Sequence, residues 1–183
     1  MKASIDKSVF RKAQDYCVGI VQALSVKHKD HHQLDELFGE MKLLALQSKA
    51  VVEAEHTILP KLLENLHKAK PSVPAQKLCD YLALKHLLPI WCCTAMPLIV
   101  FTEEEGIIYS RSDKIIQHDG TIEKWAIATA KSTDLLFIVE SIAEGQYDTI
   151  KTATEDIMDM VSMFFGGRLQ SVILMADVPE RVL

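Results

Sequence analysis

Histidines near position 30 have the composition and spacing of a potential metal site. His28, His31 and His32 lie close together, and Glu36 follows His32 by one helical turn. Imidazole and carboxylate groups are common ligands of zinc in proteins. Asp30, however, is suited to cap a helix that starts within this group, because its short side chain can accept a hydrogen bond from a free backbone N–H. We therefore interpret the cluster as a solvated helix start and predict no metal.

Two Glu-x-x-His motifs form a second candidate metal site. Glu53 precedes His56 and Glu64 precedes His67 with the spacing that di-iron carboxylate bundles use on two facing helices. Here only Pro60 and a few other residues separate the motifs, and the further glutamates that would bridge the irons are missing. A leucine stripe occupies the face beside them. The sequence therefore predicts no iron site and no other cofactor.

Thiols and a His-Asp pair are the remaining chemical groups that stand out. Cys92 and Cys93 follow Trp91 in apolar surroundings, which raise the pKa of a thiol and make it a poor nucleophile. His118 and Asp119 precede Gly120, so a turn explains this pair more simply than a metal-dependent hydrolase does. Phosphate-binding loops, the serine-hydrolase elbow and the zinc-protease motif are absent from the sequence. We predict no catalytic residue and no enzymatic activity.

Composition predicts one globular domain spanning residues 1–183. Hydrophobic residues make up 49% of the chain and charged residues 25%, which is typical of a folded protein. The formal net charge is −5 and no arginine-rich run occurs, so binding to nucleic acid is not expected. Residues 1–7 lead into a charged amphipathic segment, without the apolar region of a signal peptide. We expect a cytoplasmic protein.

The uncharged stretch at 87–102 separates two halves of different character. It is shorter than the roughly 20 apolar residues of a membrane span, and Pro89 and Pro97 interrupt any helix through it. Direct membrane insertion is therefore not expected. Before it, apolar residues recur every three or four positions and predict helices over 8–27, from Asp30 to as far as His56, over 59–66 and over 76–88, with a loop at 70–75. Residues 1–89 are thus predicted to form a helical half.

The second half, residues 90–183, is predicted to contain strands and two further helices. Apolar and β-branched residues on either side of a turn at 102–106 predict a hairpin of 98–101 with 107–109. Further strands are predicted at 114–117 and within 122–130, where a helix is the alternative. Helices are predicted from Ser132 or Thr133 to Gly145 and over 147–165, followed by a strand at 169–175. The fold class is α+β, with a helical N-terminal half packed on a small, mainly antiparallel sheet.

Some apolar residues lie outside the stripe through which a helix packs on the core, and these residues predict a surface for protein partners. Met160, Met163 and Phe165 lie off the main apolar stripe of the helix at 147–165, and methionine suits surfaces that accept several partners. The uncharged stretch adds a possible groove. The predicted partner-binding residues are Ile90, Trp91, Leu98, Val100, Met160, Met163 and Phe165. Acidic residues concentrated between positions 134 and 159 favour a partner with a basic flank; the oligomeric state is left open.

A short segment of the second half resembles a known family of secretion proteins. The run Glu104-Glu105-Gly106-Ile107-Ile108, followed later by Thr133-Asp134-Leu135-Leu136, is similar to an arrangement in small acidic adaptors of the bacterial type IVB (Dot/Icm) secretion system. The likeness covers less than a third of the chain. It implies a cytoplasmic adaptor or chaperone, connected with virulence, that docks on the coupling complex and presents effector proteins for secretion. It implies no particular binding residue.

A small-molecule sensor or enzyme is the alternative function. Its apolar pocket would be lined by Trp91, Cys92 and Tyr109, with His86 or His118 supplying the polar contact. This alternative requires Trp91, Cys92 and Tyr109 to converge with at least one of the two histidines in the folded chain.

Overall fold

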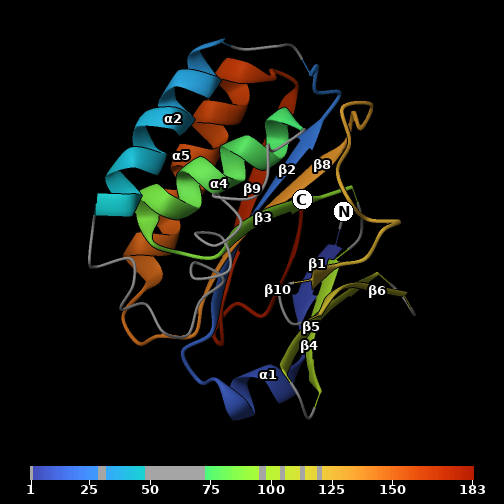
Figure 1. Cartoon of the computed structure of the whole chain (residues 1–183). Coiled ribbons are helices and arrows are strands. Elements are labelled where there is room, and N and C mark those ends of the chain that lie inside the picture. Colours follow the sequence, from blue (N-terminus) through green and yellow to red (C-terminus); the bar gives the residue numbers. More distant parts are fainter. Residues whose placement is uncertain are drawn as a thin grey trace.

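The fold has three layers: a layer of helices, a four-stranded sheet and a six-stranded sheet. The computed structural model describes residues 2–28, 32–47, 73–94, 98–103, 106–111, 114–118 and 121–183. Figure 1 shows the helix layer on one side of the four-stranded sheet and the six-stranded sheet on its other side. The layer consists of α2 (His32–Gln47), α4 (Pro74–His86) and α5 (Tyr147–Phe164). The predicted α+β class is confirmed.

The four-stranded sheet has a recognisable strand order. Its strands run β3 (Ile90–Cys93), β8 (Leu135–Ser141), β2 (Cys17–Leu24) and β9 (Arg168–Leu174), and every neighbouring pair is antiparallel. The chain enters β2, crosses through α2 and α4 to β3, returns in β8 and crosses through α5 to β9. This order is the split βαβ arrangement of ferredoxin-like folds.

The six-stranded sheet is built from a segment inserted between β3 and β8 together with the two ends of the chain. Its order is β10 (Glu180–Val182), β1 (Lys2–Ile5), β4 (Leu98–Glu103), β5 (Gly106–Arg111), β6 (Lys114–His118) and β7 (Thr121–Ile122). The β1–β4 pair is parallel and the other pairs are antiparallel. The predicted hairpin is confirmed as β4 and β5, which pair from Ile99 with Ser110 to Glu103 with Gly106.

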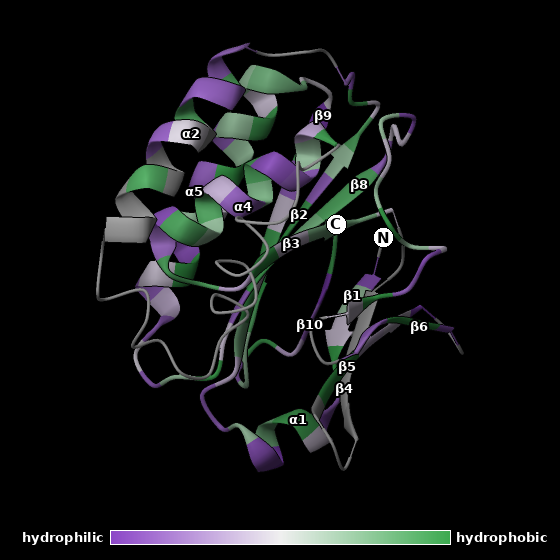
Figure 2. Cartoon of the chain, viewed as in Figure 1, coloured by the Kyte–Doolittle hydropathy of each residue, from purple (hydrophilic) through white to green (hydrophobic). Residues whose placement is uncertain are grey.

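The four-stranded sheet is buried on both faces. Alternate residues of β2 and β8 enter two separate cores, as the period of two along a strand requires. Val21 and Phe137 lie in the core beneath the helices, whereas Ile20 and Ile138 lie in the core between the two sheets. Figure 2 shows β8 hydrophobic along most of its length, while the helices mix hydrophobic and hydrophilic residues.

The predicted helix over 8–27 is wrong. The chain forms only the short helix α1 (Lys7–Lys12) and then turns into strand β2. Asp6 caps α1 by accepting a hydrogen bond from the backbone N–H of Ser8 at 2.7 Å. The segment of β2 was predicted as a helix because a strand that is buried on both faces is an almost continuous run of apolar residues. Such a run also contains apolar residues three and four positions apart, as a helix does.

The predicted helix from Ser132 or Thr133 to Gly145 is wrong for the same reason. Residues 135–141 form strand β8, whose first five residues are all buried. The helical N-terminal half is not confirmed either, because the described chain begins with β1 and contributes the central strand β2 before its first long helix.

The helices predicted near residues 80 and 155 agree with the structure. α4 confirms the helix predicted at 76–88, and α5 confirms the helix at 147–165. β9 confirms the strand at 169–175, and β6 confirms the one at 114–117. Neither the strand nor the helix predicted within 122–130 forms: β7 overlaps this range only at Ile122, and Ile127 makes an isolated bridge with Cys93. α2 confirms a helix after Asp30, but its predicted extension to His56 and the helix at 59–66 lie outside the described residues. Residues 70–72 of the predicted loop at 70–75 also lie outside them, and the loop prediction is wrong at Pro74 and Ala75, which begin α4.

Candidate functional site

Strand β3 places two of the predicted partner-binding residues in the interior. Ile90 is 2% exposed and lies in the core beneath the helices, whereas Trp91 is 4% exposed and lies in the core between the sheets. Neighbouring residues of a strand point to opposite faces, so the two side chains cannot share one groove. Leu98 and Val100 lie in β4, where they pair with Ala3 and Ile5, and their side chains lie outside the described residues.

The other three predicted residues lie near the carboxyl end of α5. Met163 is 70% exposed, Met160 is partly buried against the core beneath the helices, and Phe165 is 3% exposed. Met163 and Phe165 line a common surface pocket of about 310 Å³. The structure thus brings these two together and separates them from Trp91.

Two consecutive glycines shape this pocket. Gly166 and Gly167 have φ angles of 62° and 93°, a region that L side chains rarely adopt. The N–H of Gly166 bonds to the carbonyls of Val161 and Ser162, which ends α5. The N–H of Lys27 then donates to the Phe165 carbonyl at 3.0 Å, so the end of α5 is tied to the segment that follows β2. The pocket is lined by Ser25, Lys27, Ser162, Met163, Phe164, Phe165, Gly166 and Gly167.

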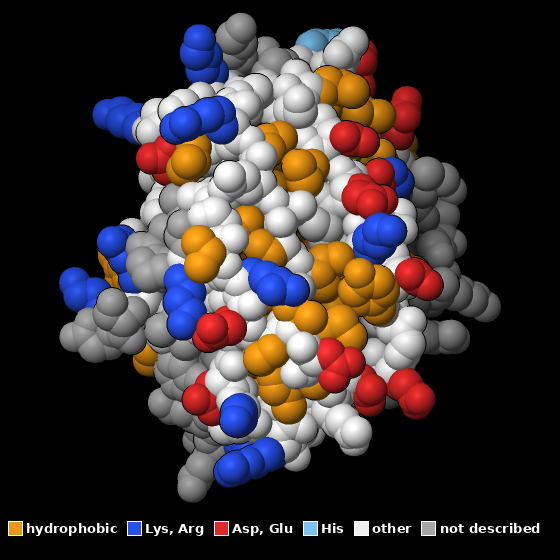
Figure 3. Space-filling model, turned by 180° about the vertical axis from the view of Figure 1, so that it is seen from behind, with side chains coloured by type: hydrophobic (Ala, Val, Ile, Leu, Met, Phe, Trp, Pro, Cys, Tyr) orange, Lys and Arg blue, Asp and Glu red, His pale blue; other side chains and the backbone are white. Residues whose placement is uncertain are grey.

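The outer face of α5 carries three exposed acidic residues and one exposed lysine, Lys151. Asp148, Glu155 and Asp159 are exposed and recur at helical spacing along one side, and they lead toward Met163. Figure 3 shows acidic side chains along one side of the face that carries α5, with hydrophobic side chains gathered beside them. This arrangement suits a ligand that combines an apolar side chain with positive charge.

Asp156, also on α5, has a different role because it joins two helices. Its carboxylate accepts a hydrogen bond from Lys85 Nζ at 2.6 Å and lies 2.8 Å from His86 Nε2, both on α4. Burial opposes its ionisation, but Lys85 and His86 more than offset this and lower the pKa of Asp156. Burial also lowers the pKa of His86, although Asp156 opposes the shift. This group fixes α4 against α5.

A polar cluster is buried between the two sheets. Tyr16 Oη lies 2.6 Å from Tyr109 Oη and donates to Glu140 Oε2 at 3.0 Å, and Tyr109 Oη also donates to Glu140. Trp91 Nε1 lies 3.4 Å from Glu140 Oε1, and its ring meets the Tyr109 ring edge-on at a centroid distance of 4.8 Å. The cluster connects β3 and β8 of one sheet with β5 of the other.

The acid–base properties of this cluster follow from its burial. Burial raises the pKa of Glu140, and the three donors limit the rise by stabilising the carboxylate. Burial and the neighbouring carboxylate raise the pKa values of Tyr16 and Tyr109, so both phenols stay protonated and serve as donors. Sequence reasoning singled out Trp91 and Tyr109 but missed Tyr16 and Glu140, because no local pattern connects residues 124 positions apart.

Of the residues of the alternative small-molecule site, Trp91 and Tyr109 are in contact, but Cys92, His86 and His118 do not join them. Cys92 lies in the core beneath the helices, on the opposite face of β3 from Trp91. His86 contacts Asp156, and His118 lies in β6 of the six-stranded sheet. Cys17, Cys79, Cys92 and Cys93 are all buried thiols outside any disulfide, and burial raises the pKa of Cys17 to about 11 and that of Cys79 well above its usual value. These thiols are poorly suited to nucleophilic attack.

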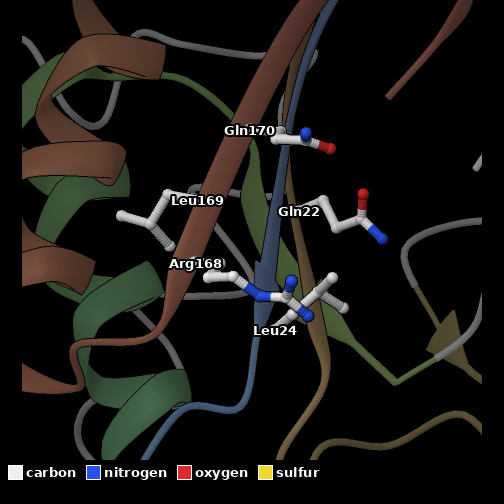
Figure 4. A pocket seen from close by; sticks show the side chains of 5 residues that line it. All are labelled: Gln22, Leu24, Arg168, Leu169 and Gln170. Carbon is white, nitrogen blue, oxygen red and sulfur yellow. The ribbon is translucent and has the colours of Figure 1, made fainter.

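Strand β9 contributes a further surface feature. Gln22, Leu24, Arg168, Leu169 and Gln170 line a small pocket of about 120 Å³ at the start of this strand. Figure 4 shows Leu169 pointing toward the helices and Gln170 pointing to the opposite side, as strand alternation requires.

Of the histidines near position 30, His32 and Glu36 form an ion pair at 3.2 Å, and His31 lies outside the described residues. Within the described ranges, no three His, Cys, Asp or Glu side chains are grouped so as to hold a metal ion. None of the described helices combines the length and apolarity that crossing a membrane requires.

No protein-family model matches the chain, and no curated protein has a significantly similar sequence.

Proposed function

We propose that this chain is a non-enzymatic protein-interaction module, a cytoplasmic adaptor or chaperone that binds partner or effector segments for secretion. One observation carries the proposal: Met163, with 70% of its side chain exposed, stands at the rim of a pocket of about 310 Å³ beside the acidic face of α5. Large exposed apolar side chains beside a hollow are a common feature of surfaces that bind proteins.

The chemistry of this surface defines the partner segment. An apolar side chain of the partner would enter the pocket beside Met163, and lysine or arginine residues would lie along Asp159 and Glu155. Charge attraction of this kind accelerates association and weakens as salt is added. Secretion as the biological context rests on the resemblance of residues 104–108 and 133–136 to the type IVB adaptors.

The test is a selection of random peptides displayed on phage against the wild-type protein. We expect enriched peptides that combine an apolar residue with lysine or arginine. Met163→Glu should weaken their binding at least tenfold, because it places a charge where an apolar contact forms. Leu43→Glu is the matched control, since Leu43 is 62% exposed on α2 and does not line the pocket. Equal binding by the two variants, or no enriched peptide, would contradict the proposal.

The acidic face is tested separately by charge reversal. Asp159→Lys should weaken the same peptides severalfold at low salt and have little effect at high salt, because screening removes the electrostatic contribution. A loss of binding that is independent of salt would show that charge complementarity is not the reason for recognition.

A further inference from the structure

The two sheets end in four edge strands of very different length. β10 has three residues, β7 has two and β3 has four, whereas β9 has seven. An edge strand presents unpaired backbone N–H and C=O groups that can bind a further strand, and short edges offer few of them. Among the described residues, β9 pairs only with β2 along its length. It is therefore the long open edge of the described fold.

β9 lacks the features with which edge strands usually avoid pairing. Its register with β2 runs without a bulge from Arg168 to Leu174, and it contains no proline. Its only charged residue is Arg168, at the first position. β10, by contrast, carries Glu180 and Arg181 within three residues. The β9 edge is thus both long and unprotected.

Apolar side chains border this edge on its helix side. Leu169 and Ile173 of β9 and Met158 of α5 are only partly buried and pack against the core beneath the helices. Met158 lies on the flank of α5 opposite Asp156, the residue that contacts α4, because two helical positions correspond to about 200°. Figure 3 shows hydrophobic side chains gathered on the face that carries α5 and β9. A strand added to β9 would cover part of this surface.

We propose that β9 pairs with β9 of a second copy of this chain, antiparallel and about a two-fold axis at Ser171, so that the two four-stranded sheets become one. In this register Leu169 of each copy lies opposite Ile173 of the other, on the helix side. Gln170 lies opposite Val172, and the small Ser171 lies opposite itself. Each Arg168 lies opposite Leu174, so the two guanidinium groups sit at opposite ends of the interface.

The sequence of β9 is therefore complementary to itself, which is what a two-fold symmetric interface requires. A parallel in-register pair would place Arg168 opposite Arg168, and like charges directly opposite one another destabilise strand pairing. This interface is independent of the pocket beside Met163, because it rests on the backbone edge of β9 and not on the end of α5.

The experiment is sedimentation equilibrium of the full chain at concentrations from below one micromolar to several tens of micromolar. The expected wild-type mass approaches twice the monomer mass of 20.6 kDa. Ser171→Lys should raise the dissociation constant at least a hundredfold, because it places two ammonium groups across the axis. Ser171 is exposed, so the monomer should keep the wild-type circular dichroism spectrum and melting temperature.

Thr121→Lys is the matched control, since Thr121 is also exposed and lies on the edge strand β7, which is too short to pair stably. This variant should dimerise like the wild type. Hydrogen exchange gives a second readout: alternate β9 amides should be protected in the wild type only at concentrations where the dimer forms.

Three results would overturn the proposal. The first is a wild-type protein that stays monomeric throughout the concentration range. The second is a Ser171→Lys variant that dimerises like the wild type, which would place the interface elsewhere. The third is a monomer whose β9 amides become protected only when another protein binds, which would make β9 an edge for a foreign strand.

Discussion

Asp80 is a carboxylate that the fold buries on α4. Its side chain is 8% exposed and accepts a hydrogen bond from Gln76 Nε2 at 2.9 Å. Burial raises its pKa from 3.8 to about 6, and the Gln76 hydrogen bond only partly opposes this rise. The folded protein therefore binds this proton more tightly than the unfolded chain does.

The contribution of Asp80 to the free energy of unfolding should consequently fall as pH rises. Because the folded-state pKa of Asp80 is raised, its contribution is fully present below pH 3.8 and is lost as pH rises through about 6. Between about pH 4 and pH 7 the free energy of unfolding of the wild type should fall by about 2 kcal/mol relative to Asp80→Asn. Urea unfolding across this range measures the difference. Parallel pH profiles for the two proteins would show that Asp80 titrates normally.

The Glu140 cluster leads to a second prediction at this scale. Tyr109→Phe removes a donor from a buried carboxylate and should lower the free energy of unfolding by about 1–3 kcal/mol at neutral pH. The control is Tyr147→Phe, which removes the same hydroxyl from a ring that is 45% exposed. It should change stability by less than about 0.5 kcal/mol. Chemical denaturation measures the change in the free energy of unfolding for both variants. Equal changes would mean that the Tyr109 hydroxyl contributes no more to stability than an exposed hydroxyl does.

At the scale of elements, α5 packs closely on β2 at Gly19. A Cβ atom added at Gly19 would overlap Thr154 Oγ1 of α5 and lie 2.9 Å from Val139 Cγ1 of β8. Thr154 is itself held by a hydrogen bond from its hydroxyl to the Ile150 carbonyl at 2.7 Å. Glycine at this position thus allows α5 to pack directly on the centre of the sheet.

Gly19→Ala should therefore destabilise the protein by about 3 kcal/mol, because the added methyl forces α5 away from the sheet. Gly39→Ala is the comparison: it adds the same methyl in α2, where nothing lies within 4 Å. Alanine favours a helix, so this variant should gain about 0.5–1 kcal/mol. Thermal unfolding distinguishes the two. Similar effects in both variants would show that the space at Gly19 is not limiting. Combining Gly19→Ala with Thr154→Ala should reduce the loss in free energy of unfolding that Gly19→Ala causes.

Elements also differ in how well their sequences predict them. α5 buries one face, so its apolar residues recur with the helical period and identify it. α4 keeps apolar residues at helical spacing although its buried residues extend around most of the helix and Lys85 is its only exposed residue. β2 and β8 bury both faces, and Cys17–Leu24 contains one polar residue, Gln22, in an apolar run. Such a run satisfies both the helical and the extended pattern. Its β-branched residues Val18, Ile20 and Val21 favour a strand and were the available signal.

At the scale of the whole molecule, the layers should differ in local stability. β2 is paired on both sides and seven of its eight residues are buried, so both cores must open before its amides exchange. β7 has two residues at the outer edge of the six-stranded sheet and pairs there with β6. Few interactions oppose its local opening.

Hydrogen exchange followed by mass spectrometry should therefore give a gradient across the layers. Amides of β2 and β8 should exchange only on global unfolding, whereas those of β6 and β7 should exchange at a much lower free energy. Adding a low concentration of denaturant should accelerate exchange in β2 more than in β7, because global opening exposes more surface. Uniform protection across both sheets would indicate one cooperative unit without this hierarchy.

The sequence by itself determined the features that depend on neighbours along the chain. These are the helices at 76–88 and 147–165, the hairpin of 98–101 with 107–109 and the strand at 169–175. The tertiary structure decided the features that depend on remote segments. β2 is a strand because helices cover one of its faces and a second sheet covers the other, and Tyr16 meets Glu140 only through that layering. A strand with one buried face shows alternating apolar and polar residues, which identify it. A strand that buries both faces, such as β2, shows no such alternation.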